Sequence, residues 1–90
     1  MFELFETEEF LKNIDKLQNK DAIFIRKKLA SYVYPQLRNE PRFGLNIKKL
    51  KNYTPETWRY RIGKYRVFYS IDEEDNLVFL LIIEARKNAY

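Results

Sequence analysis

The chain of 90 residues contains no cysteine and no histidine. Without cysteine it has no disulfide, no thiolate nucleophile and no thiolate-bound zinc. Without histidine it also lacks the commonest general base and the commonest metal ligand. Any catalysis must therefore use Arg, Lys, Tyr, Ser, Thr or carboxylates, and we expect neither a metal ion nor a cofactor.

Other scarce features exclude further classes of protein. Only two glycines and three prolines occur, which excludes low-complexity and collagen-like chains. The longest apolar run, which ends at Ile83, is far shorter than the roughly 20 residues of a membrane helix. The first six residues lack the basic segment of a secretory signal, so we expect a cytoplasmic protein with no membrane association.

Hydrophobic residues make up 46% of the chain and aromatic residues 17%. This composition supports a packed core, and the length suits a single domain over residues 1–90. Alternating or continuous apolar patterns predict strands at 2–6, 45–50, 57–62, 65–71 and 77–83, the last buried on both faces.

Helical spacing of apolar residues predicts two helices between the first two strands. Thr7 caps the first, which stops near residue 18, and Asp21 caps the second. Pro35 disfavours helix at Tyr34, so the second helix ends there and a loop follows over 36–42. The order strand-helix-helix-strand-strand-strand-strand predicts an α+β fold, an antiparallel twisted sheet with two helices packed on one face.

The positive charge is concentrated in one part of the chain. Residues 1–41 carry no net charge, residues 42–70 carry +7 and residues 71–90 carry −3. A block of this kind attracts polyanions, because binding phosphates releases condensed counterions. The alternative is a solvated basic surface, which most charge runs are.

Alternation over 57–62 places Arg59 and Arg61 on one face of a strand, opposite Trp58 and Tyr60. A hairpin at Gly63-Lys64 brings Arg66 across from Arg61, and Arg86 follows the last strand. Each arginine could instead pair with a nearby carboxylate. Residues 57–70 contain no acidic residue, which argues against local neutralisation.

Three segments carry a resemblance to a known family: Lys49-Leu50, the run from Trp58 to Asp72 and the run from Glu84 to Tyr90. In these segments, and in the preceding strand-helix-helix order, the chain resembles the RelE/ParE toxin superfamily of toxin–antitoxin systems. The RelE-like branch implies a metal-independent endoribonuclease that cleaves mRNA in the ribosomal A site and inhibits translation. The ParE-like branch implies a DNA gyrase inhibitor that does not cleave RNA.

The resemblance also implies site residues and partners. The catalytic residues are Arg59, Arg61, Arg66, Arg86 and Tyr90. The partners are a cognate antitoxin, the ribosome and mRNA. The residues expected to bind the RNA backbone are Lys48, Lys49, Lys51, Lys64 and Lys87. For the first three of these lysines, protection of an edge strand is the alternative.

Cleavage would proceed by attack of the RNA 2′-hydroxyl on the adjacent phosphate. Guanidinium groups can stabilise the phosphate charge, but they cannot move protons at neutral pH. Proton transfer would fall to Tyr90, Lys64 or Glu84. Ala85 occupies a position where many relatives have histidine, so a catalytically inert nucleic-acid-binding relative is a third hypothesis, beside the nuclease and the gyrase inhibitor.

A metal-dependent nuclease is disfavoured. Its carboxylates would have to come from the consecutive residues 72–75, which are typical of a solvated turn. The sequence also contains no glycine-rich phosphate-binding loop.

Overall fold

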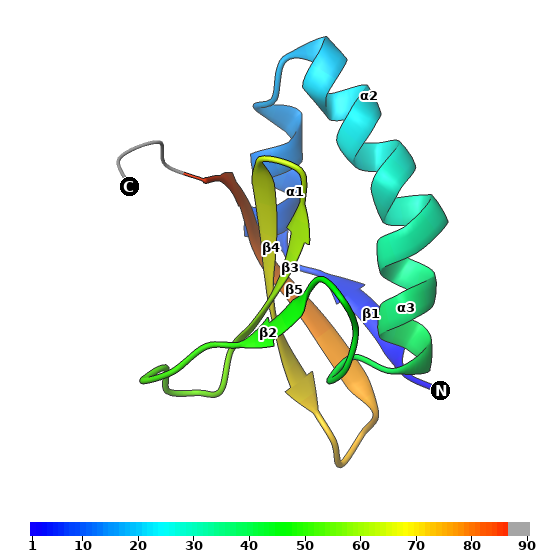
Figure 1. The fold of residues 1–90 in the computed structure, drawn as a ribbon, viewed down its shortest axis with the longest axis vertical. Helices are drawn as coiled ribbons and strands as arrows, with labels where there is room; N and C mark the ends of the chain where they lie inside the picture. Colours follow the sequence, from blue (N-terminus) through cyan, green and yellow to red (C-terminus); the bar gives the residue numbers. More distant parts are fainter. Residues whose placement is uncertain (87–90) are drawn as a thin grey trace.

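The computed structural model describes residues 1–86. The helices lie together on one side of a five-stranded sheet with the strand order β1-β5-β4-β3-β2 (Figure 1). In chain order the elements are β1 (Glu3–Glu6), α1 (Glu8–Asp15), α2 (Asn19–Lys28), the π-helical turn η1 (Leu29–Val33), α3 (Tyr34–Asn39), β2 (Ile47–Lys49), β3 (Trp58–Ile62), β4 (Tyr65–Asp72) and β5 (Leu77–Ala85).

The predicted α+β class, with two helical segments on one face of a sheet, is confirmed. Strands β2 to β5 pair as antiparallel neighbours. Strand β1 differs from the prediction in one detail, because it joins the sheet parallel to β5. No hairpin links these two strands, so nothing in the connection forces the antiparallel arrangement.

The core lies between the helices and one face of the sheet. Every second residue of β3 and of the first part of β4 points into it, as the alternation predicts. The buried strand residues are Tyr60, Ile62, Tyr65, Val67, Tyr69, Val78, Leu80 and Ile83. They pack with the helix residues Phe10, Ile14, Ile25, Leu29, Val33 and Leu37. The arginines of β3 and β4 therefore point to the opposite face, which we call the open face.

The hydroxyl of Thr7 fastens the start of α1 to the sheet. Its oxygen accepts a hydrogen bond from the Phe10 N–H at 3.2 Å, which confirms the predicted cap. The same hydroxyl lies 2.8 Å from the carbonyl oxygen of Leu80, to which it donates. One side chain thus caps a helix and joins it to β5.

The predicted end of the second helix is wrong. The chain stays helical through Pro35 and ends α3 at Asn39, so the predicted loop over 36–42 is shorter. The reason is the turn η1, in which the Tyr34 N–H bonds to the Leu29 carbonyl five residues earlier. This wider turn lies just before the proline and accommodates its ring and its missing N–H.

Two other helix boundaries also differ from the prediction. The first helix ends at Asp15 rather than near residue 18. Gln18 precedes α2, and Asp21 lies inside its first turn instead of capping it. A carboxylate in the first turn still suits the helix dipole, which explains why the sequence pattern looked like a cap.

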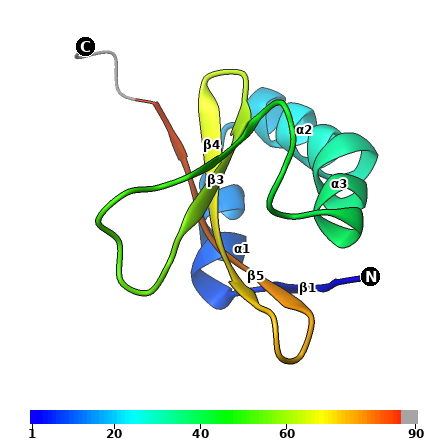
Figure 2. The same cartoon turned by 60° about the horizontal axis from the view of Figure 1, so that its bottom comes forward.

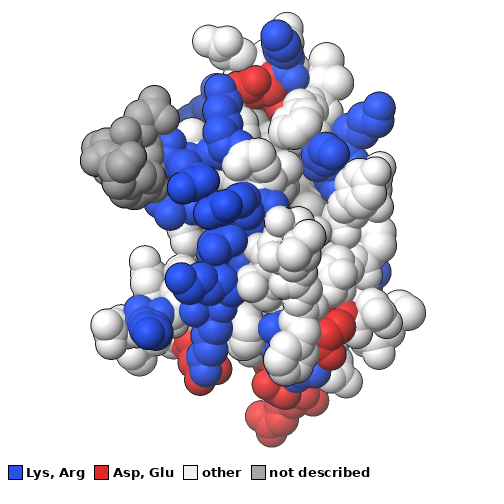
Figure 3. Space-filling model, viewed as in Figure 1, with Lys and Arg blue, Asp and Glu red and all other residues white. Residues whose placement is uncertain are grey.

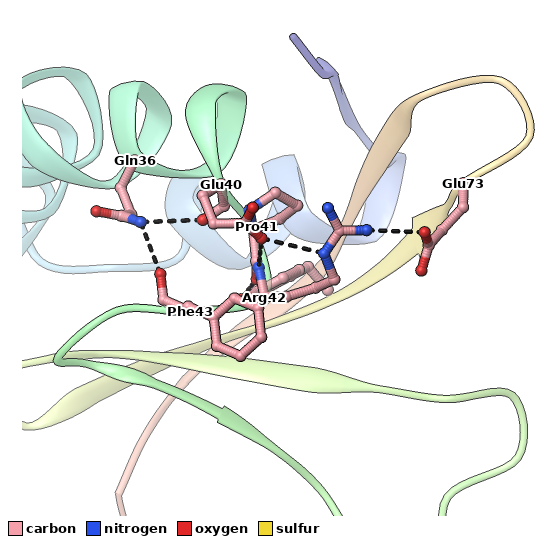
Figure 4. A network of polar contacts seen from close by, with 7 residues as sticks. Gln36, Glu40, Pro41, Arg42, Phe43 and Glu73 are labelled. Atoms are coloured by element: carbon pink, nitrogen blue, oxygen red, sulfur yellow. Dashed lines mark hydrogen bonds and ion pairs between the residues drawn. The ribbon is translucent and has the colours of Figure 1, made fainter.

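Hydrogen bonds fix the segment between α3 and β2, which runs beside the helices before it returns to β3 (Figure 2). The buried Tyr69 hydroxyl donates to the Pro41 carbonyl at 2.7 Å. The Gln36 side-chain amide donates to the carbonyls of Glu40 and Phe43, both at 2.9 Å (Figure 4). Arg42 bridges Glu40 at 3.1 Å and Glu73 at 2.7 Å, so the segment is also tied to the β4–β5 turn.

We expect Tyr69→Phe to lower the free energy of unfolding by about 1–2 kcal/mol, because the Pro41 carbonyl would lose its buried donor. Urea unfolding would measure the change. Tyr53→Phe is the matched control, because the Tyr53 side chain is half exposed and its substitution should change stability little. Equal stability of the two variants would contradict the anchoring role of Tyr69.

Asp21 joins α2 to the turn between β3 and β4. Its carboxylate accepts a hydrogen bond from the Tyr65 hydroxyl and lies 3.7 Å from the Lys64 ammonium. The hydrogen bond from Tyr65 holds the pKa of Asp21 below its ordinary value of 3.8. The same bond raises the pKa of Tyr65 to about 12.

This contact predicts a pH dependence of stability. The folded-state pKa of Asp21 lies below its unfolded value of 3.8, so its contribution is complete above that pH and is lost as the pH falls through the folded-state pKa. Asp21→Asn should therefore destabilise the protein at neutral pH, and its deficit relative to the unchanged protein should shrink in acid. Thermal unfolding of both proteins across this pH range measures it, and a deficit independent of pH would contradict the contact.

Candidate anion-binding site

Four arginines predicted from the sequence come together on the open face. Arg59, Arg61, Arg66 and Arg86 line a shallow pocket of about 290 Å³, together with Lys48 and Leu50. We call this the cationic pocket. Its side chains come from β2 and the residue after it, from β3 and β4, and from the residue after β5. These strands are adjacent in the sheet. Lys and Arg side chains form a band over this part of the surface (Figure 3).

Backbone pairing sets the positions of these cations. Arg61 lies opposite Arg66 in the β3–β4 ladder, and Lys48 lies opposite Arg59 in the β2–β3 ladder. The Arg86 N–H donates to the Lys64 carbonyl at 2.6 Å, which keeps the chain after β5 beside the hairpin. The cationic pocket is therefore built on hydrogen-bonded strands rather than on loose loops.

The electrostatics of the pocket favour an anion. Burial, followed by the charges of Arg61, Arg86 and Arg66, lowers the pKa of Arg59 below its ordinary value of 12.5. The like charges around Arg59 thus disfavour its protonated form, and a bound anion would relieve the repulsion. Arg66 adds a buried Nε–H that has no acceptor within the described residues.

Arg66 has a carboxylate partner, contrary to the expectation from residues 57–70. The Arg66 guanidinium lies 3.4 Å from the carboxylate of Glu84, its register partner on β5. The sequence window contains no acid, but the neighbouring strand supplies one from 18 residues away. Both side chains are part exposed, which screens the pair and leaves its net contribution small.

The structure does not gather the predicted lysines in the same way. Of those it describes, Lys48 alone lines the cationic pocket. Lys49 pairs with Glu56 at 2.8 Å, and Lys64 pairs with Asp21 on the helix side of the hairpin. Lys51 is exposed in the turn that follows β2. Lys87 and Tyr90 lie outside the described residues.

The described part of the site can bind and polarise a phosphate. Guanidinium groups on a rigid sheet donate paired hydrogen bonds to phosphate oxygens and stabilise added charge. For proton transfer, Glu84 is the carboxylate beside the pocket, in contact with Arg66. Residues 1–86 contain no cluster of three metal-ligating side chains. In the acidic turn, the Asp72 carboxylate accepts hydrogen bonds from the backbone N–H groups of Glu74 and Asp75.

Sequence reasoning missed a second, apolar half of the open face. Residues 77–83 were predicted to be buried on both faces, but Phe79, Leu81 and Ile82 are only half buried. A groove of about 260 Å³ lies here, lined by Tyr53, Thr57, Phe68, Leu81, Ile82 and Glu84. The continuous apolar run over residues 77–83 was the signal for this groove, because a strand with one face in the core needs apolar side chains only at every second position.

The comparisons with known proteins agree on the fold. The family model described as "ParE toxin of type II toxin-antitoxin system, parDE" matches residues 6–90. Comparison with curated proteins finds no match. No helix within residues 1–86 is long and apolar enough to cross a membrane.

Solved structures with the same fold include one isolated RelE toxin and two toxin–antitoxin complexes. The toxin–antitoxin complex RelBE2 of Mycobacterium tuberculosis matches at 20% identity with a TM-score of 0.72, covering 94% of this chain and 98% of the other. The isolated RelE toxin of E. coli matches at 23% identity with a TM-score of 0.71, covering 99% and 88%. The intact RelBE complex of E. coli matches at 23% identity with a TM-score of 0.69, covering 98% and 100%.

If the cationic pocket binds phosphates, inorganic tripolyphosphate should raise the melting temperature of the protein. We expect Arg61→Gln to reduce this shift by at least half, because one pocket cation is removed. Arg26→Gln is the matched control, because Arg26 lies on α2 and pairs with Asp15. Added salt should weaken the effect in the unchanged protein. An equal shift in both variants would place the anion elsewhere.

Proposed function

The chain belongs to the ParE toxin family of type II toxin–antitoxin systems, and from this premise we propose that it is a metal-independent endoribonuclease that cleaves ribosome-bound mRNA and so inhibits translation. The observation that carries the proposal is the convergence of four arginines in one pocket on the open face. Such an activity belongs in the cytoplasm, where ribosomes are found.

The chemistry requires no group beyond the RNA and this protein. The 2′-hydroxyl attacks the adjacent phosphorus and the P–O5′ bond breaks, which leaves a 2′,3′-cyclic phosphate and a free 5′-hydroxyl. One base must accept the 2′-hydroxyl proton, and one acid must supply a proton to the leaving oxygen. Charge on the phosphate grows during the attack, so fixed cations accelerate it.

Each pocket residue has a role in this reaction. Arg59, Arg61 and Arg86 hold the non-bridging phosphate oxygens, and the unpartnered Nε–H of Arg66 completes the set of donors. Glu84, already in contact with Arg66, accepts the 2′-hydroxyl proton. Tyr90, which the resemblance places among the catalytic residues, supplies the proton to the leaving oxygen.

The lysines contribute less directly. Lys48 extends the cationic pocket along the RNA backbone. The other predicted lysines guide the polyanion toward the pocket at longer range: Lys49, Lys51, Lys64 and Lys87. The ion pairs of Lys49 with Glu56 and of Lys64 with Asp21 do not prevent this long-range attraction.

We also propose a cognate antitoxin as protein partner. Several solved structures with this fold are toxin–antitoxin complexes. The half-exposed apolar groove beside the cationic pocket suits a partner that combines apolar side chains with acidic ones, because both kinds of surface lie on the open face.

The second candidate function is inhibition of DNA gyrase without RNA cleavage. The match to the ParE family model favours it, whereas RelE toxins are among the similar solved structures. A supercoiling assay with purified gyrase separates the two functions. Unimpaired supercoiling at saturating protein would exclude this candidate.

The test of the nuclease is cell-free translation of a defined mRNA. The unchanged protein should cut the message only when ribosomes engage it, and the new ends should carry a cyclic phosphate and a 5′-hydroxyl. Arg61→Ala should slow cutting by about 100-fold, the effect of removing one donor to a charged transition state.

Arg26→Ala is the control and should cut at the original rate, because Arg26 is exposed and lies outside the pocket. An intact message in the presence of the unchanged protein would refute the nuclease. With gyrase also unaffected, the catalytically inert, nucleic-acid-binding relative would remain.

A further inference from the structure

A second groove adjoins the cationic pocket on its helix side. It has a volume of about 280 Å³ and is lined by Lys28 and Tyr32 from the helical segment, Asn46 from the segment before β2, and the end of β3. Arg61 lines both this groove and the cationic pocket, so the two sites are neighbours. We call it the side groove.

The side groove exists because β2 is short. Pairing between β2 and β3 begins at Ile47, opposite Tyr60. The Arg61 N–H still reaches the carbonyl of Asn46 at 3.0 Å. Beyond that point β2 no longer covers β3, and the space between β3 and the helical segment opens.

An exposed aromatic ring stands in this groove among cations. The Tyr32 side chain is 61% exposed. The Lys28 ammonium lies 4.8 Å from the centroid of its ring. Exposed aromatic rings beside Lys and Arg are the features that hold unstacked bases in single-stranded nucleic acid, since every base has a flat face that can stack.

Asn46 adds a group that can read a base edge. Its carbonyl is occupied by Arg59 and Arg61. Its side-chain amide is exposed and has no hydrogen-bond partner within residues 1–86. An amide offers a donor and an acceptor side by side, which matches the paired groups on the edge of a base.

The segment that carries Asn46 is held firmly. The Gln36 side chain donates to two of its carbonyls (Figure 4). The Tyr69 hydroxyl donates to a third. A Cβ on Gly44 would lie 3.1 Å from Ile47 Cδ1 and 3.3 Å from Gln36 Nε2, so the segment packs closely against its neighbours. A fixed backbone at Asn46 and a fixed edge of β3 lower the entropy cost of binding.

We propose that the side groove is a nucleobase subsite for single-stranded RNA. The base next to the phosphate held by Arg61 stacks on Tyr32, and the amide of Asn46 bonds its edge. This assignment rests on the proposed ribonuclease function and extends it, because it identifies the residues that select which nucleotide lies beside the cleaved bond.

The test measures binding separately from cleavage. Short oligonucleotides with 2′-deoxy sugars lack the attacking hydroxyl, and fully abasic oligonucleotides of equal length keep the phosphates alone. Fluorescence anisotropy should show that Tyr32→Ala weakens binding of the base-bearing probe by about fivefold or more and leaves the abasic probe unchanged. Tyr32→Phe, which keeps the ring, should bind like the unchanged protein.

Asn46→Ala should reduce the difference in affinity between base-bearing probes of different sequence, and Arg61→Gln should weaken both the base-bearing and the abasic probe. Thermal unfolding of each variant checks that the fold is intact. An equal effect of Tyr32→Ala on both probes, or no effect on either, would overturn the subsite. Binding of a protein partner that requires Tyr32, with no dependence of RNA binding on the bases, would also overturn it.

The two proposals fail in different ways. Binding that depends on the bases and on Tyr32, in a protein that leaves ribosome-bound mRNA intact, supports the subsite and refutes the nuclease. Cleavage with normal rate and normal base preference in both Tyr32→Ala and Asn46→Ala refutes the subsite and supports the nuclease.

Discussion

Mutual repulsion among like charges is the constraint around which this protein is organised. One pocket holds the four arginines Arg59, Arg61, Arg66 and Arg86. Burial lowers the pKa of Arg59, and the charges of the other three arginines lower it further. Isolated side chains would separate. Here the β2–β3–β4–β5 ladders fix the backbone, and the apolar core on the other face supplies the free energy that holds the ladders together.

That arrangement suits the binding of a polyanion. Cations already in place need no reorganisation when an anion arrives, so their effect on a developing charge is large. Glu84 moderates the repulsion at Arg66 without filling the pocket, since it lines the neighbouring apolar groove instead. The open face therefore combines a cationic half and an apolar half, which is an appropriate surface for both a nucleic acid and a protein antitoxin.

The helical side contributes more than a cover for the core. The turn η1 carries the helix past Pro35, so that α3 reaches Asn39 and places Gln36 beside the following segment. The hydroxyl of Tyr69, on the central strand β4, fixes the same segment by its hydrogen bond to the Pro41 carbonyl. The position of Asn46 and the start of β2 thus depend on contacts with two distant parts of the chain, and the side groove depends on where β2 starts.

Elements whose sequence pattern is local follow from the sequence alone. Alternation over residues 57–62 is a short-range signal, and it predicts that Arg59 and Arg61 share one face. The Gly63-Lys64 turn is another, and it predicts that Arg66 lies across from Arg61. The fold sets which charges are paired, because Glu84 reaches Arg66 across strands, Glu56 reaches Lys49 from a loop and Asp21 reaches Lys64 from a helix. It also decided the side groove, since Tyr32, Asn46 and Arg61 become neighbours through packing, which no spacing along the chain encodes.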